Sequence, residues 1–199
     1  KVEAQIKFGW EIDAYPVNEI ADYVSDVSKG DIDALVDEYY EKYDILLEGR
    51  DPEEFKKHVA VQAGIEIGFE RFLEDKNYQA IVTHFGDLGS LKQLPGLAIQ
   101  RLMEKGYGFG AEGDWKVAAM TAIMKAMAEG KNGGTGFMED YTYHLVEGEE
   151  YSLGAHMLEV CPSMAAGKPR IETHHLGIGM NEKDPARLVF EGKAGSAIV

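Results

Sequence analysis

The chain has 199 residues, 45% of them apolar, which is enough for one packed domain or for one domain and part of another. Its 35 Asp and Glu outnumber 20 Lys and Arg, giving a net charge of −15. Such a surface repels phosphate backbones and anionic lipids, so nucleic acid and membranes are not expected partners. A single cysteine, Cys161, excludes an internal disulfide and suits a cytoplasmic protein.

Helices are expected to dominate the first part of the chain. Residues 17–28 and 31–43 have helical patterns, and Asp31 is a suitable N-cap for the second. A third helix is predicted over 52–76, because Asp51 can cap it and proline occupies its first position. Its apolar residues recur at helical spacing, so it should lie against a core.

Strands and helices then alternate. Residues 78–85 and 107–111 are short apolar runs typical of buried strands. Helices are predicted at 95–106, opened by Pro95, and at 114–130, ending at a glycine. This alternation predicts an α/β fold with a parallel sheet.

The glycine-rich segment 130–136 marks a change of pattern and predicts a division into domains of 1–133 and 134–199. Residues 137–145 and 154–160 alternate in polarity and predict a β-hairpin, with further strands at 169–178 and 187–190. The second domain is therefore predicted to be the beginning of a mostly β domain. Since the chain ends on an apolar run, we expect it to be part of a longer polypeptide.

Glu112 is the first candidate for chemistry, because it lies between a predicted strand end and a predicted helix start. Ligands of open α/β sheets bind at the carboxyl ends of the strands. Flanking Gly110 and Gly113 allow close approach of the backbone. The alternative is a solvated glutamate that the dipole of the helix N-terminus stabilises.

Glu139 and His156 form the second candidate, because a hairpin can bring them onto one face. If 146–149 form a four-residue loop, Leu145 pairs with Glu150, and the same register places Glu139 opposite His156. A two-residue loop keeps them on one face, whereas a three-residue loop separates them. A solvated glutamate and a buried structural histidine are the alternatives.

Other histidines are weaker candidates. His174 and His175 are adjacent, and neighbouring strand residues point to opposite faces, so both are not expected to bind one metal. His84 lies near the end of the predicted strand 78–85 and is a candidate neighbour of a site.

Several blocks of sequence resemble the L-arabinose isomerases strongly, in the family's order and spacing. These blocks are 91–103, 106–116, 137–144, 154–163, 176–179 and 184–190. The resemblance implies a metal-dependent aldose–ketose isomerase that converts L-arabinose to L-ribulose, and also D-galactose to D-tagatose, through a metal-stabilised ene-diol. It further implies a divalent metal, usually Mn²⁺, a hexamer in the cytoplasm, and Rossmann-like α/β domains followed by a barrel-like β domain. Oxygen and imidazole ligands suit Mn²⁺ or Co²⁺ as the cofactor.

The resemblance also implies roles for particular residues. Glu112, Glu139 and His156 correspond to three of four metal ligands, with Glu112 and Glu139 also moving the proton, and Phe85 corresponds to a residue lining the sugar pocket. The family's fourth ligand is a histidine in a later segment that these 199 residues do not contain. Two further acids are candidate orienters of the ligands: Asp114 and Asp140.

Two alternatives stay open at this point. The chain could belong to an L-fucose-type isomerase, which turnover on L-fucose would reveal. It could also be a truncated non-catalytic sugar-binding or assembly module, in which case it would show neither Mn²⁺ uptake nor ketose formation.

Overall fold

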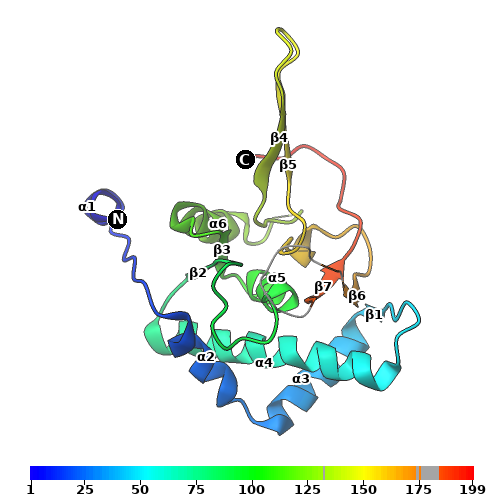
Figure 1. The fold of residues 1–199 in the computed structure, drawn as a ribbon. Helices are drawn as coiled ribbons and strands as arrows, with labels where there is room; N and C mark the ends of the chain where they lie inside the picture. The colour runs from blue at the N-terminus through cyan, green and yellow to red at the C-terminus, as the bar shows by residue number, and fades with distance from the viewer. Residues whose placement is uncertain (132, 174, 176–183) are drawn as a thin grey trace.

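The computed structural model describes residues 1–131, 133–173, 175 and 184–199, and it has a mixed α/β fold (Figure 1). Its helices are α1 (Val2–Phe8), α2 (Val17–Ser25), α3 (Lys29–Lys42), α4 (Pro52–Lys76), α5 (Gly96–Glu104), α6 (Trp115–Ala128) and the 3₁₀ turn η1 (Pro162–Met164). Its strands are β1 (Asp44–Ile45), β2 (Ala80–Thr83), β3 (Gly108–Ala111), β4 (Glu139–His144), β5 (Tyr151–Ala155), β6 (Arg170–Thr173) and β7 (Ala186–Val189).

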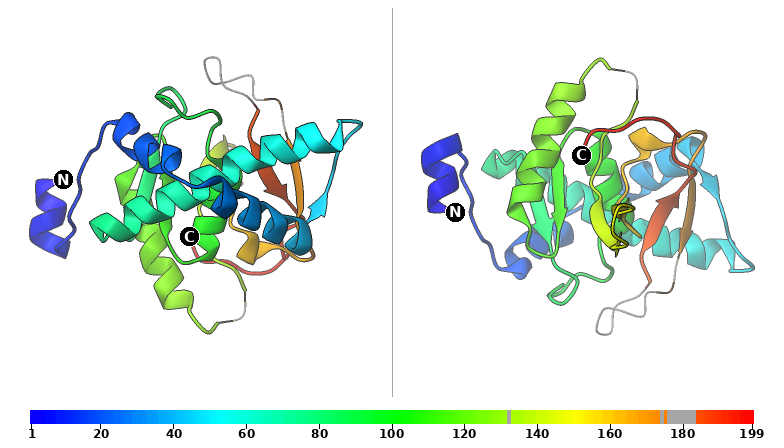
Figure 2. Two further views of the ribbon diagram at one scale, coloured as in Figure 1. Left: turned by 90° about the horizontal axis from the view of Figure 1, so that it is seen from below. Right: turned by 90° about the horizontal axis from the view of Figure 1, so that it is seen from above.

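The elements lie in successive layers around α4 and α5. Helices α2 and α3 pack on one side of the long helix α4, and α5 packs on its other side (Figure 1). Helix α6 covers the β2–β3 pair, while the β4–β5 hairpin projects beyond it and α1 stands apart at the N-terminus (Figures 1 and 2). No helix in the described part of the chain combines the length and apolar character that crossing a membrane requires.

Local sequence signals explain where α3 and α4 begin. Asp51 accepts hydrogen bonds from the backbone N–H groups of Glu53 and Glu54, as predicted for the start of α4. The prediction that Asp31 caps α3 is wrong: Ser28 is the N-cap, and its hydroxyl accepts from the Asp31 N–H. Because Ser28 lies three residues before Asp31, a cap at Ser28 lets the helix begin about one turn earlier than a cap at Asp31 would.

The described strands form three small sheets and not one large sheet. Strands β2 and β3 are parallel, which confirms the predicted α/β pattern. Strand β1, which was not predicted, pairs in parallel with β6, and β7 pairs antiparallel with β6. Strands were predicted around β6 and β7, although 176–178 of the first prediction lie outside the described residues. No barrel closes among the described strands, so the Rossmann-like and barrel-like architectures stay predictions.

Two apolar cores hold the layers together. The first surrounds α5, β2 and β3 and includes Phe69, Leu102 and Phe109. The second joins α3 and α4 to Ile171 and Leu188 of the β6–β7 pair. Because the second core contains residues from both sides of position 133, the two predicted regions share buried surface. The division at residue 133 remains a prediction.

Glycine in β3 allows α6 to approach the sheet closely. A Cβ atom added to Gly108 would lie 2.2 Å from the carbonyl oxygen of Ala118 and 2.8 Å from the Cβ of Ala122, both in α6. Phe109, between two glycines, faces the opposite side and is buried in the first core. Strand β3 is thus fixed on both faces just before it reaches Glu112.

We expect Gly108→Ala to lower the free energy of unfolding of the chain by about 2 kcal/mol, because α6 must move away from a methyl group that has no space. The control is Gly167→Ala, since a Cβ at Gly167 meets no atom within 4 Å. Urea unfolding followed by circular dichroism measures both variants. Equal stability of the two would contradict the close packing of β3 and α6.

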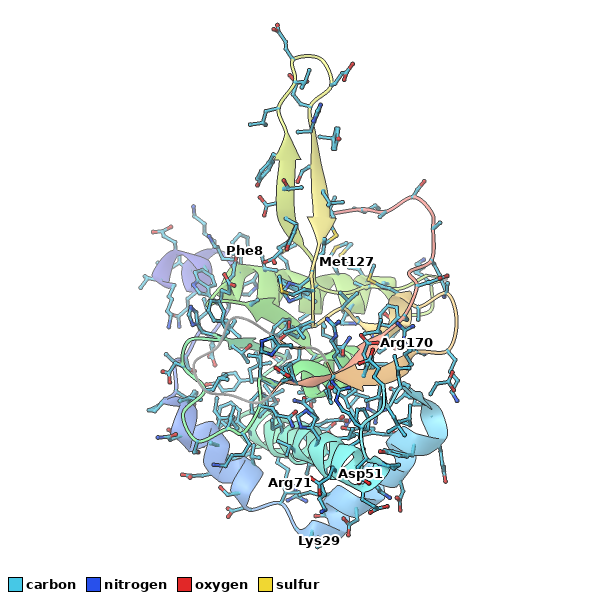
Figure 3. The ribbon with its side chains drawn as sticks, turned by 45° about the vertical axis from the view of Figure 1, so that its right-hand side comes forward. Phe8, Lys29, Asp51, Arg71, Met127 and Arg170 are labelled. Carbon is cyan, nitrogen blue, oxygen red and sulfur yellow. The ribbon has the colours of Figure 1, made fainter. Side chains whose placement is uncertain are left out.

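The β4–β5 hairpin carries apolar side chains that no other described element covers. Tyr141, Tyr143, Leu145, Tyr151 and Leu153 are all exposed, and Figure 3 shows the hairpin side chains extending from an isolated pair of strands. Exposed apolar patches of this kind mark surfaces that bind other protein segments.

Candidate functional site

Two of the predicted residues, Glu139 and His156, meet at the foot of the hairpin. The His156 Nδ1 lies 3.1 Å from the Glu139 Oε1. Glu139 is the first residue of β4 and His156 directly follows β5. The side chain of Glu139 is about one-third exposed, whereas that of His156 is 9% exposed. The predicted convergence of this pair is therefore present.

The strand register that produces this contact differs from the prediction. Near the turn, Thr142 pairs with Leu153, as the predicted four-residue loop requires. The register then shifts between Asp140 and Thr142, so Glu139 pairs with Ala155 instead of His156. The extra residue of a β-bulge bends the strand. His156, just beyond β5, is no longer held to the strand and turns its ring toward Glu139.

Glu159 is a third member of this cluster, and it was not predicted. Its Oε2 lies 2.6 Å from the His156 Nε2, and the residue is only 4% exposed. Residues 154–160 were interpreted as one strand, in which positions three apart point to opposite faces. That interpretation is wrong after Ala155, where β5 ends. The available signal was the acid itself, placed between apolar Leu158 and Val160, since a buried carboxylate needs a partner.

Aromatic packing ties this cluster to β3. The rings of Phe137 and His156 meet edge to face with centroids 4.7 Å apart. Phe137 in turn packs edge to face on Phe109 of β3, at 5.2 Å. The imidazole thus packs against the Phe137 ring, and a carboxylate lies at each of its two nitrogens.

The charges around His156 favour its protonated form. Burial by itself lowers the pKa of His156, but the hydrogen bonds and negative charges of Glu159 and Glu139 outweigh burial. The net result is a pKa above the ordinary value for histidine. The site therefore attracts positive charge between Nδ1 and the Glu139 carboxylate.

Glu112 lies on the loop between β3 and α6, as predicted. It is exposed and adopts a left-handed backbone conformation with φ of 56°, which is uncommon for a residue other than glycine and is found at turns and functional sites. Within the described residues, no three or more His, Cys, Asp and Glu side chains converge as a ready metal cluster. Glu112 accordingly does not complete a three-ligand group with Glu139 and His156 in this structure.

The remaining candidates lie elsewhere or have structural partners. Phe85 is partly buried in the loop after β2, with its ring stacked on that of His84 at 5.0 Å. Asp114 caps α6 by accepting from the N–H groups of Lys116 and Val117. The exposed His175 contacts Asp184, and His174 lies outside the described residues.

Two sequence comparisons bear on this site. The family model described as L-arabinose isomerase central domain matches residues 1–130, and the one described as L-arabinose isomerase C-terminal domain matches residues 134–199. The second match contains Glu139, His156 and Glu159, and the first contains Glu112.

Curated relatives match along the whole chain. L-arabinose isomerases of Geobacillus stearothermophilus and Thermotoga petrophila are each 56% identical over 198 residues, which is all of this chain and 39% of each relative. The L-arabinose isomerase of Salmonella arizonae is 52% identical over 200 residues, or 40% of its length. The chain thus spans about two-fifths of these relatives. With both family models matching and more than half of the residues identical, the chain belongs to the L-arabinose isomerase family.

Proposed function

We propose that the complete protein containing this chain is an isomerase that interconverts L-arabinose and L-ribulose, and also D-galactose and D-tagatose. The observation that carries the proposal is the Glu139–His156 pair, whose polar atoms lie 3.1 Å apart in a chain of this family. The names of the curated relatives support the first substrate.

A divalent cation fits the donor atoms of this pair. A carboxylate oxygen and an imidazole nitrogen suit Mn²⁺ or Co²⁺, and the excess negative charge around His156 favours a cation there. We propose Glu112, Glu139 and His156 as ligands, with the remaining ligand supplied by a segment beyond these 199 residues. In this arrangement Glu112 would turn its exposed side chain toward the pair.

The reaction moves one proton between neighbouring carbons of the open-chain sugar. One carboxylate takes the C2 proton of the aldose while O1 gains a proton, and the resulting ene-diol then loses the O2 proton and gains a proton at C1. We assign these transfers to Glu112 and Glu139, because positioned carboxyl groups act as general acid and base. His156 serves only as a ligand. A bound divalent cation would supply electrostatic stabilisation of the partial negative charge that develops on the sugar oxygens as the protons move.

The chain's other residues shape the surroundings of this chemistry. Phe85, next to the loop after β2, would line the sugar pocket with an apolar ring. The exposed hairpin would be covered by further β structure in a barrel-like domain, and β2–β3 would belong to a larger Rossmann-like sheet. We further propose a homo-hexamer in the cytoplasm.

Removing the metal tests the proposed function. Treatment of the complete protein with EDTA is expected to lower L-ribulose formation by about 100-fold or more, because Lewis-acid stabilisation supplies several kcal/mol. Added Mn²⁺ or Co²⁺ should restore the rate, and added Ca²⁺ serves as the control.

The choice of substrate separates the proposal from its alternatives. Full turnover of L-arabinose after EDTA would contradict the metal site. Faster turnover of L-fucose than of L-arabinose would instead favour an L-fucose-type isomerase. A protein with neither Mn²⁺ uptake nor ketose formation would be a non-catalytic sugar-binding or assembly module.

A further inference from the structure

Glu159 is a buried acid that the proposed chemistry does not use. Its side chain is 5% exposed, and its Oε2 lies 2.6 Å from the His156 Nε2. Transferring a carboxylate from water to such a place is costly unless a charged or hydrogen-bonded partner compensates it. Its placement beside His156 therefore needs an explanation.

The contact determines which nitrogen of His156 can face a cation. A carboxylate accepts hydrogen bonds, so the short contact places a proton on Nε2 between the two side chains. The other nitrogen, Nδ1, then faces the Glu139 Oε1 at 3.1 Å. Two acceptor atoms at that distance need a positive charge between them, which either a proton or a metal ion supplies.

The orientation of the ring is fixed from three directions. Glu159 holds Nε2, Glu139 faces Nδ1, and Phe137 packs edge to face at 4.7 Å between centroids. Phe137 restrains the ring but cannot distinguish the two nitrogens. Of the two carboxylates, Glu159 makes the shorter contact, 2.6 Å at Nε2 against 3.1 Å for Glu139 at Nδ1.

We propose that Glu159 is a positioning residue that orients His156 and increases its basicity for binding a divalent cation at Nδ1. The inference rests on the proposed function, because it assumes a cation beside Glu139 and His156. A carboxylate bonded to the far nitrogen of a histidine ligand fixes the tautomer and strengthens the ligand, and its loss typically weakens metal binding 10–100-fold.

Two substitutions in the complete protein separate the charge from the hydrogen bond. Glu159→Gln keeps the shape and an acceptor oxygen but removes the charge, whereas Glu159→Met removes both. We expect Mn²⁺ affinity, measured from the electron paramagnetic resonance signal of free Mn²⁺, to fall about 10–100-fold in Glu159→Met. The Mn²⁺ affinity of Glu159→Gln should lie between those of Glu159→Met and wild type.

The matched control is Glu172→Gln. Glu172 is also a largely buried acid, with a 13% exposed side chain, but it pairs with Arg187 and Arg170. A residue whose role is only structural would change the melting temperature without changing metal affinity, so Glu172→Gln should bind Mn²⁺ as wild type does. Thermal melting of the metal-free proteins, followed by circular dichroism, reports folding independently of metal.

The outcomes distinguish this inference from the proposed function. If wild type binds Mn²⁺ and both folded Glu159 variants bind it within twofold of wild type, the positioning role is overturned and the proposed function stands. If Glu159→Met does not fold, equal affinity of Glu159→Gln and wild type still overturns it. If wild type takes up no Mn²⁺, the proposed function fails and this inference fails with it.

Discussion

Glu139→Gln is expected to lower turnover of L-arabinose by the complete protein to about one-hundredth of wild type or less. The substitution removes a group proposed to transfer the proton, and positioned acids and bases contribute roughly 10²–10⁴-fold. It also removes the negative charge that faces the His156 Nδ1 at 3.1 Å, so cation affinity should fall with the rate. Glu112→Gln should have a similar effect on turnover.

Steady-state kinetics at saturating Mn²⁺ measure this effect, with Glu149→Gln as the control. Glu149 is an exposed acid at the tip of the same hairpin, and its substitution should leave turnover unchanged. If either Glu139→Gln or Glu112→Gln retained more than about a tenth of wild-type activity, the assignment of acid–base roles would be wrong, since a lost general acid or base costs more than that.

Arg101→Leu is expected to lower the free energy of unfolding of the chain by about 3 kcal/mol. Arg101 of α5 lies in a buried network, in which its Nε contacts the Glu66 carboxylate at 3.2 Å and its Nη2 donates to Glu38 at 2.6 Å. Glu66 is fully buried and also accepts a hydrogen bond from the Tyr39 hydroxyl. Burial and the nearby Glu66 charge raise the pKa of Tyr39 well above its ordinary value, so Tyr39 stays a donor.

Removing the guanidinium leaves the Glu66 carboxylate buried with less positive charge beside it, although Lys105 remains 2.9 Å away. The control is Arg71→Leu, because Arg71, which is labelled in Figure 3, forms an exposed ion pair with Asp31. An exposed ion pair contributes roughly 0–1 kcal/mol. Urea unfolding should therefore separate the two variants, and equal losses would contradict the buried network.

Most of the helices were predictable because their signals are local. Asp51 and Pro52 start α4 through contacts within one turn of the helix. The error at α3 was also local, since Ser28 and Asp31 are both good caps and only the observed hydrogen bond decides between them. Strand β1 has two residues and no pattern of its own. It exists because β6, more than 120 positions later, pairs with it.

The candidate site was likewise predictable from the sequence only in part. The alternating pattern and the turn allowed Glu139 and His156 to share a face, and resemblance to a family singled out both residues together with Glu112. The bulge that changes their register and the bend that returns Glu159 to His156 were not predicted. Both depend on where β5 leaves its partner strand. Packing against Phe137 and β3 influences that position, and the spacing of residues along the chain does not encode it.

The sequence by itself determined the α/β alternation, the hairpin, the excess negative charge and the family, because each follows from residues close together or from motifs in a fixed order. Only the tertiary structure decided that Glu159 joins His156, that Arg101 and Glu66 meet in the interior, and that both sides of position 133 share a core. These features require segments to pack against one another, and the energy of burying a charge depends on every neighbour that the fold supplies.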